Sequence, residues 1–241
     1  MPTNVGNKLA TSIRRQADRV LIQGQRFESF DQLRQRHFWS TYYFTPNAAG
    51  YVISQTFPLF VTPSGQNGQG FPSGVTLTDR ETNWKSQNRV PDNQNFEITE
   101  LGVTLYPVTQ DIFDTSTNQP NLTAITPRMQ YEFLNNTVVG ITYLTNSVPL
   151  GLCADFAQAS GPAFGSNQGL ANANYVRTNG FAAPSLRRRF KIPILLQHGE
   201  TFSFYFQNPR DYYIGVNEAG GISPFLVRLD TWATESYVER S

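Results

Sequence analysis

The feature that most constrains the fold is the stretch between Leu186 and Gln207, where apolar residues recur at every second position on two successive segments. A period of two is typical of strands that bury one face. The polar link 197–201 contains Gly199, which accepts the positive φ of a tight turn, so we predict a β-hairpin with a phenylalanine-rich inner face. Its inward-facing residues are Phe190, Ile192, Ile194, Leu196, Phe202, Phe204 and Phe206.

Two features indicate that the first of these strands lies at the edge of a sheet. Pro193 has no N–H to donate to a neighbouring strand, which favours an edge or a bulge. The strand is also preceded by three consecutive cations, Arg187, Arg188 and Arg189. Such charges guard an edge against indiscriminate pairing, or they contact an acidic loop of a neighbouring subunit or a phosphate backbone. We take these three arginines as candidate subunit contacts and keep the guard as the alternative.

Length and composition favour one β-rich domain with an appendage. A chain of 241 residues buries a sizeable core, and 18 Phe and 11 Tyr suit strands. Cys153 is the only cysteine, which excludes disulfides within the chain and a cysteine-based zinc site. No apolar run approaches the roughly 18 residues of a membrane span, and the first residues lack the apolar centre of a signal peptide. We therefore expect a protein that does not span a membrane.

The charge is distributed unevenly along the chain. Residues 1–40 hold seven Lys and Arg against three Asp and Glu, a net +4, whereas residues 41–241 hold twelve against fifteen, a net −3. Apolar residues at helical spacing between Asn7 and Gln23 predict a short basic amphipathic helix, and Ser29 with Gln32 predicts the start of a second one. We therefore divide the chain into a basic arm, 1–40, and a β-sandwich domain, 41–241.

The arm is the candidate contact with an anionic partner. A basic helix suits nucleic acid, anionic lipid headgroups or a neighbouring subunit, and the alternative is a solvated helix face. The basic residues concerned are Lys8, Arg14, Arg15, Arg19, Arg26, Arg34 and Arg36.

The body of the chain predicts about eight strands separated by long loops, with no helix between them. Further strands are expected within 42–62, 96–105, 129–133, 137–144, 212–216 and 223–232, and long loops at 63–92, 108–127 and 157–183. In segment 96–105 the apolar parity changes near Glu100, which predicts a β-bulge beside Gly102. This pattern favours an all-β fold, an antiparallel sandwich of the jelly-roll kind.

No group in the sequence points to catalysis or to a cofactor. His37 and His198 are the only histidines, no GxSxG is present, and Cys153 lies in an apolar setting that predicts a buried, inert thiol. We therefore expect no enzyme, no cofactor and no metal site; the one calcium-like pair, Asp111 and Asp114, has weak spacing.

Paired carboxylates on a β-sandwich leave glycoside hydrolysis as a third-ranked function. The candidate pairs are Asp79 with Glu81, in a polar loop, and Glu97 with Glu100, on a strand. Solvated charges are the alternative for the first pair. In the second pair Glu97 alternates with Phe96 and Ile98 and is expected to face solvent.

The basic arm NKLATSIRRQADRV, the strands FEITELGVTLYP and FKIPILLQHGETFSFYF and the closing FLVRLDTW together resemble the single jelly-roll coat proteins of icosahedral viruses, more particularly bacteriophage structural proteins. The resemblance implies a major or minor capsid protein that assembles through loop and arm contacts into an icosahedral shell. Its partners would be copies of itself, other virion proteins and, through the arm, the genome or anionic lipid. It would belong to the virion and assemble in the host cytoplasm, and its long loops would order only on assembly.

The alternative to a shell protein is a carbohydrate- or receptor-binding sandwich, such as a spike or decoration protein. Trp84, Tyr212 and Tyr213 are expected to be exposed, where they would stack on sugar rings or serve as subunit contacts.

Overall fold

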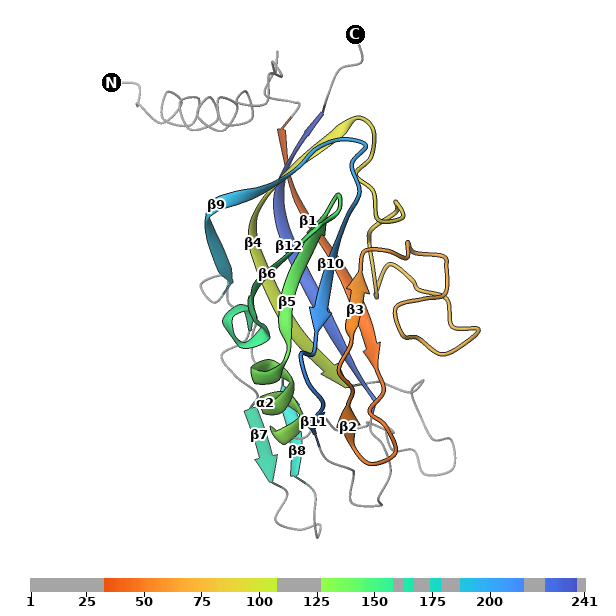
Figure 1. Cartoon of the computed structure of the whole chain (residues 1–241), viewed down its shortest axis with the longest axis vertical. Helices are drawn as coiled ribbons and strands as arrows, with labels where there is room; N and C mark the ends of the chain where they lie inside the picture. The colour runs from red at the N-terminus through yellow and green to blue at the C-terminus, as the bar shows by residue number, and fades with distance from the viewer. Residues whose placement is uncertain are drawn as a thin grey trace, which may run out of the picture.

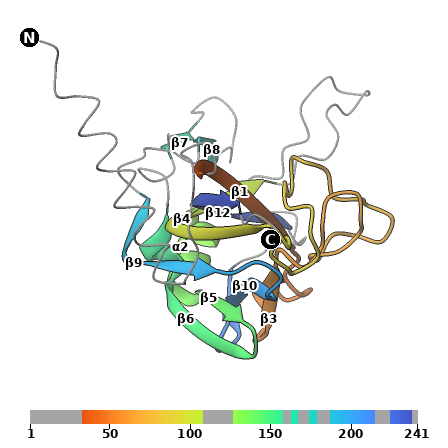
Figure 2. The ribbon, with the colours of Figure 1, turned by 90° about the horizontal axis from the view of Figure 1, so that it is seen from above.

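The computed structural model describes residues 33–107, 127–157, 163–166, 174–178, 187–214 and 224–237, and within them two four-stranded sheets face each other (Figures 1 and 2). The first sheet has the order β1-β12-β4-β9 and the second the order β3-β10-β5-β6. All pairings within both sheets are antiparallel, which confirms the predicted all-β antiparallel sandwich. The strands are β1 (Leu33–Phe44), β3 (Thr56–Leu59), β4 (Gln94–Pro107), β5 (Val138–Tyr143), β6 (Asn146–Leu152), β9 (Arg188–Leu196), β10 (Phe202–Gln207) and β12 (Phe225–Tyr237).

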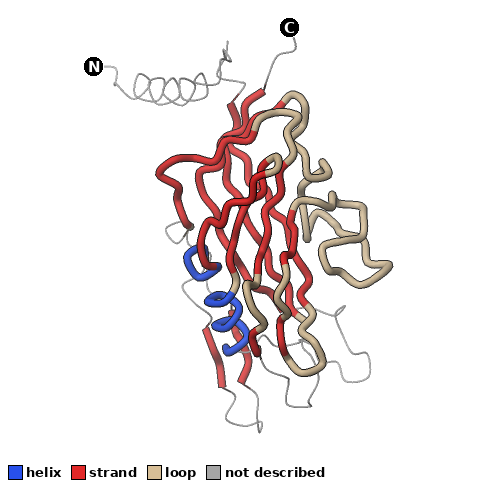
Figure 3. Tube along the Cα trace, in the orientation of Figure 1, coloured by secondary structure: helices blue, strands red, loops and turns tan. Residues whose placement is uncertain are grey.

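Smaller elements lie around this sandwich (Figure 3). Two short antiparallel pairs are formed by β2 (Tyr51–Val52) with β11 (Tyr212–Tyr213) and by β7 (Ala163–Ser166) with β8 (Asn174–Thr178). The helical elements are α2 (Pro127–Asn136) and the 3₁₀-helix η2 (Cys153–Phe156). Within the described ranges no helix has the length and apolar character needed to cross a membrane.

The core lies between the two sheets and consists mainly of aromatic side chains. The predicted inner residues Phe202, Phe204 and Phe206 of β10 are buried, as are Phe225, Val227 and Leu229 of β12. Phe44 stacks on Phe225 of the same sheet, with ring centroids 5.4 Å apart, and contacts Phe206 of the second sheet, with centroids 6.0 Å apart. Each fully buried phenylalanine contributes about 2–3 kcal/mol to folding, so this cluster is the main source of stability.

The predicted bulge in segment 96–105 is confirmed, at Thr99 instead of beside Gly102. On β12 the partner of Glu100 is Trp232 and the partner of Ile98 is Ala233, so Thr99 is the extra residue. Because of this extra residue Phe96 and Leu101 both face the core although their parity differs.

The predicted hairpin is wrong. Both of its strands exist, but β9 pairs with β4 in the first sheet and β10 pairs with β3 and β5 in the second. Residues 197–201 therefore cross from one sheet to the other (Figure 1). Alternation shows that both strands face one core, but it does not identify their hydrogen-bonding partners.

Two other segments differ from their prediction. Met129–Phe133 belongs to helix α2, not to a strand, because Met129 and Phe133 are also four positions apart and both pack into the core from one helical face. The segment 157–183, predicted as a loop, contains the strands β7 and β8.

The helix predicted to begin at Ser29 is wrong for the residues that are described. Strand β1 begins at Leu33 and pairs with β12 along its whole length, so Arg34 and Arg36 belong to the sandwich. The expected boundary between arm and body at residue 40 thus falls inside β1. The helix predicted between Asn7 and Gln23 lies outside the described residues.

Candidate functional site

The outer face of the first sheet carries a row of planar and charged side chains that crosses all four strands. His37 of β1 pairs with Trp232 of β12, Trp232 with Glu100 of β4, and Glu100 with Arg189 of β9. The imidazole stacks on the indole, with centroids 4.6 Å apart and an interplanar angle of 4°. Arg189 Nε donates to Glu100 Oε1 at 2.7 Å. The row exists because outward positions of neighbouring strands come into register.

Trp232 is covered on both faces within this row. The guanidinium of Arg187 lies 3.8 Å from the indole centroid and also pairs with Glu100 at 3.6 Å. His37 approaches from β1 and Arg187 from beyond β4, on the opposite side of β12. The indole therefore has no free face on which a sugar ring could stack.

Asp230 is a fully buried carboxylate next to this row. It accepts a hydrogen bond from His37 Nε2 at 2.9 Å on one oxygen and from Arg228 Nε at 3.0 Å on the other. Asp230 also pairs in register with Trp39, whose ring lies 5.1 Å from His37. A buried carboxylate is tolerated when both of its oxygens accept hydrogen bonds, and the bond from His37 joins β12 to β1.

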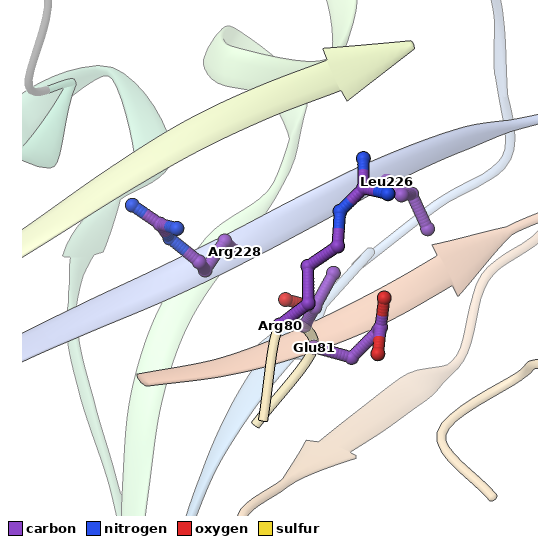
Figure 4. A pocket seen from close by; sticks show the side chains of 5 residues that line it. Arg80, Glu81, Leu226 and Arg228 are labelled. Carbon is purple, nitrogen blue, oxygen red and sulfur yellow. The ribbon is translucent and has the colours of Figure 1, made fainter. Parts of the chain in front are cut away.

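A shallow pocket of about 100 Å³ adjoins the row and is lined by Thr41, Arg80, Glu81, Leu226 and Arg228 (Figure 4). Its volume is well below the roughly 300 Å³ at which small-molecule sites begin, so it suits a single side chain or a small anion. Figure 4 shows the side chains of Arg80 and Arg228 pointing away from each other, which leaves no convergent pair of guanidinium groups.

Residues 61–92, hereafter the edge loop, cover the outer edge of β1. Asn83 binds the backbone of β1 twice, accepting from Trp39 N and donating to His37 O, both at 2.9 Å. The buried Gln69 side chain donates to Thr41 O at 2.7 Å and accepts from Phe60 N at 3.1 Å. The expectation that this loop orders only on assembly is therefore wrong, because its partners lie within one chain.

The basic residues of the arm divide into two groups. Lys8, Arg14, Arg15, Arg19 and Arg26 lie outside the described residues. Arg36 pairs with buried Glu235 at 3.2 Å, and Arg34 lies 5.3 Å above the ring of Tyr237. Both are therefore anchored to β12.

The three arginines 187–189 lie at the start of an edge strand, as predicted. Arg187 and Arg189 bind Glu100, whereas the exposed Arg188 pairs in register with Leu101 on β4. Pro193 lies in an edge strand with an irregular register beside it, so both features expected of it are present.

The expected exposure of the candidate sugar-stacking aromatics is wrong for two of the three. Trp84 is 5% exposed and packs among Phe38, Phe96 and other core rings. Tyr212 is 6% exposed, and burial raises the pKa of its hydroxyl, which hydrogen-bonds with Thr137 at 2.9 Å. Tyr213 is half-buried beside Tyr51, with centroids 5.2 Å apart.

The carboxylates considered for hydrolysis have local partners or lie in the sheet. Asp79 pairs with Lys85, which holds the pKa of its carboxyl below the usual range, and Glu81 accepts from Thr78 N at 2.8 Å. Glu97, expected to face solvent, is buried. Glu100 binds two arginines. Among the described residues no three His, Cys, Asp or Glu side chains gather as metal ligands.

Sequence reasoning missed the outer-face residues His37, Trp39, Asp230 and Trp232. A signal was present, because HFWST and LDTWAT both place polar or planar residues at every second position between core residues. What the sequence does not show is that these two segments, 193 positions apart at His37 and Asp230, lie on paired strands. No protein-family model matches the chain, and no curated protein matches it either.

Proposed function

We propose that the chain is a virion structural protein of the single jelly-roll kind, a major or minor capsid subunit that assembles with copies of itself. The observation that carries this proposal is the order of the eight sandwich strands. When they are numbered one to eight along the chain, the two sheets read 1-8-3-6 and 2-7-4-5. The pairs 1 with 8, 2 with 7, 3 with 6 and 4 with 5 are those of one long hairpin rolled into two sheets.

Eight-stranded rolls of this kind occur in viral capsids and in lectins. The strand order therefore does not distinguish these two classes of protein, and the surface residues have to. A sugar site is favoured by exposed aromatic faces, but Trp84 and Tyr212 are buried and Trp232 is covered on both sides. On the outer face of the first sheet, ion pairs and hydrogen bonds tie the polar side chains to one another. These features support a subunit that makes contacts over the lectin alternative.

The arm carries less positive charge when it ends before β1 than when it ends at residue 40. If β1 begins at Leu33, the arm is residues 1–32, with five Lys and Arg against three Asp and Glu, a net +2. This is a small excess for binding nucleic acid, where affinity grows with each neutralised phosphate. Within the proposal, the arm faces the shell interior and contacts neighbouring subunits, with the genome or anionic lipid as a further partner.

The test is the assembly state of the purified full-length chain. We expect sedimentation velocity and negative-stain microscopy to show multimers or shells that grow with protein concentration. A chain that stays monomeric up to millimolar concentration would refute the proposal. Binding to a glycan array by that monomer would instead support the carbohydrate-binding alternative, which the rolled strand order also allows.

A further inference from the structure

The two long sides of the sandwich differ in how their edges are covered. On the side of β1 and β3, the edge loop hydrogen-bonds to the outer backbone of β1 through Asn83 and Gln69. On the other side lie β6 and β9, the end strands of the two sheets (Figures 1 and 2). Within the described part of the chain, residues 146–151 and 188–196 make backbone hydrogen bonds only to their neighbours in the sheet.

Apolar side chains of inward parity are exposed along this second side, which we call the seam and define by Val148 of β6 and Ile192 of β9. Val148 pairs with the core residue Ile141, so it has inward parity, yet it is 51% exposed. Ile192 shares the parity of Phe190 and Ile194, which pack against the core, yet it is 84% exposed. The prediction that Ile192 faces inward is therefore wrong.

The register of β9 explains the position of Ile192. Pairing with β4 jumps from Arg189 opposite Glu100 to Ile194 opposite Ile98, so residues 190–193 form a bulge that has no register partner except the single residue Thr99 opposite it. An edge strand that bulges to protect itself normally presents polar groups. This bulge instead presents an exposed isoleucine, an apolar side chain whose burial against a partner would be favourable.

We infer that the seam is the surface on which a second copy of this chain docks, with the two copies related by a twofold axis. A twofold interface must be complementary to itself. Exposed Arg188 and Lys191 flank the seam on β9, and exposed Asp155 follows β6 on η2. In a twofold arrangement the cations of one copy can therefore meet the anion of the other around an apolar centre.

The contact is made by side chains and not by strand addition. Strand β6, with the sequence NSVPLGL, carries no charge that would repel a second β6, but Pro149 at its centre has no N–H to donate to a new strand. Strand β9 has Pro193 inside its bulge for the same effect. This inference rests on the proposed function, because self-assembly supplies the second copy.

The test replaces Ile192 in the full-length chain and measures association by sedimentation velocity over a range of concentrations. We expect Ile192→Glu, and separately Val148→Glu, to weaken association at least tenfold, because each buries an unpaired carboxylate in an apolar contact. The matched control is Val75→Glu. Val75 is 43% exposed and lies in the edge loop on the opposite side, so this variant should associate like the parent. All three side chains are exposed, so each variant should keep the circular dichroism spectrum and unfolding midpoint of the parent.

The outcomes separate this inference from the proposed function. If the parent associates and both seam variants associate equally tightly, the seam is not the interface, while the proposed function stands. If association instead requires residues 1–32 and is insensitive to Ile192, the arm is the interface and the inference fails. If the parent remains monomeric at every concentration, both the inference and the proposed function fail.

Discussion

Asp230 has no access to solvent, although it lies on the outer face of a sheet, and its carboxylate depends on His37 and Arg228. We predict that Asp230→Asn lowers the free energy of unfolding by about 2 kcal/mol, because the amide cannot offset the charge of the half-buried Arg228. Chemical denaturation followed by tryptophan fluorescence measures this. Asp79→Asn is the matched control: its exposed pair with Lys85 contributes little, so no measurable change is expected. Equal effects of the two substitutions would contradict a special role for the buried cluster.

The environment of Cys153 leads to a prediction about how its thiol titrates and reacts. Burial, and then the nearby Asp155, raise the pKa of its thiol well above the ordinary value. The unfolded chain therefore releases this proton at a lower pH than the folded chain, and the thiol's contribution to stability is lost as the pH rises above about 8.5. At pH 8 a thiol reagent should label the folded protein only as fast as the protein opens.

The control for this labelling experiment is Ser147→Cys, which adds a thiol at an exposed position of β6. This variant should take up one equivalent of reagent at once and the second one slowly. Immediate labelling of Cys153 in the folded parent chain would show that its surroundings admit solvent, contrary to its full burial.

At the scale of elements, the edge loop depends on Gln69. Its amide satisfies Thr41 O, Phe60 N and Ser40 Oγ, all of them buried. We expect Gln69→Ala to destabilise the protein by about 2–4 kcal/mol, because Thr41 O and the Ser40 hydroxyl lose the bond to Gln69, while Phe60 N keeps its bond to Ser40 Oγ. Trypsin should then cut the loop faster, at Arg80 or Lys85. Gln66→Ala, in the same loop but with an exposed side chain, should leave both stability and cleavage unchanged; equal cleavage of the two variants would exclude Gln69 as the anchor.

Strands were predictable where alternation was long, and their partners were not. Phe202, Phe204 and Phe206 indicate a buried strand face unambiguously, whereas the same pattern is compatible with β10 lying in either sheet. The secondary structure of short segments was predicted wrongly for a different reason. Met129 to Phe133 fits a period of two and a spacing of four equally well, and the helix forms because both residues then reach one core. The outer-face cluster was hidden because its members come from opposite ends of the described chain.

At the scale of the whole molecule, the first described strand and the last are neighbours, and this decides where the chain can be cut. Charge alone places the end of the arm at residue 40, but Leu33 to Ser40 form eight register pairs with β12, and Phe38 among them is a core residue. We predict that a chain lacking residues 1–32 keeps the unfolding midpoint of the parent. A chain lacking residues 1–40 loses most of the β1 pairing, the Arg36 ion pair and the His37 contacts together.

The shorter chain should therefore fail to fold cooperatively, because the edge of β12 and the rings of the core around Phe38 become exposed at once. Circular dichroism melts of the two truncated chains, purified side by side, measure the difference. The comparison is sharp because the two chains differ by only eight residues, all in one strand. If the chain starting at residue 41 melts as cooperatively as the chain starting at residue 33, β1 is dispensable, and the pairing of first and last strands on which the rolled architecture depends would have to be abandoned.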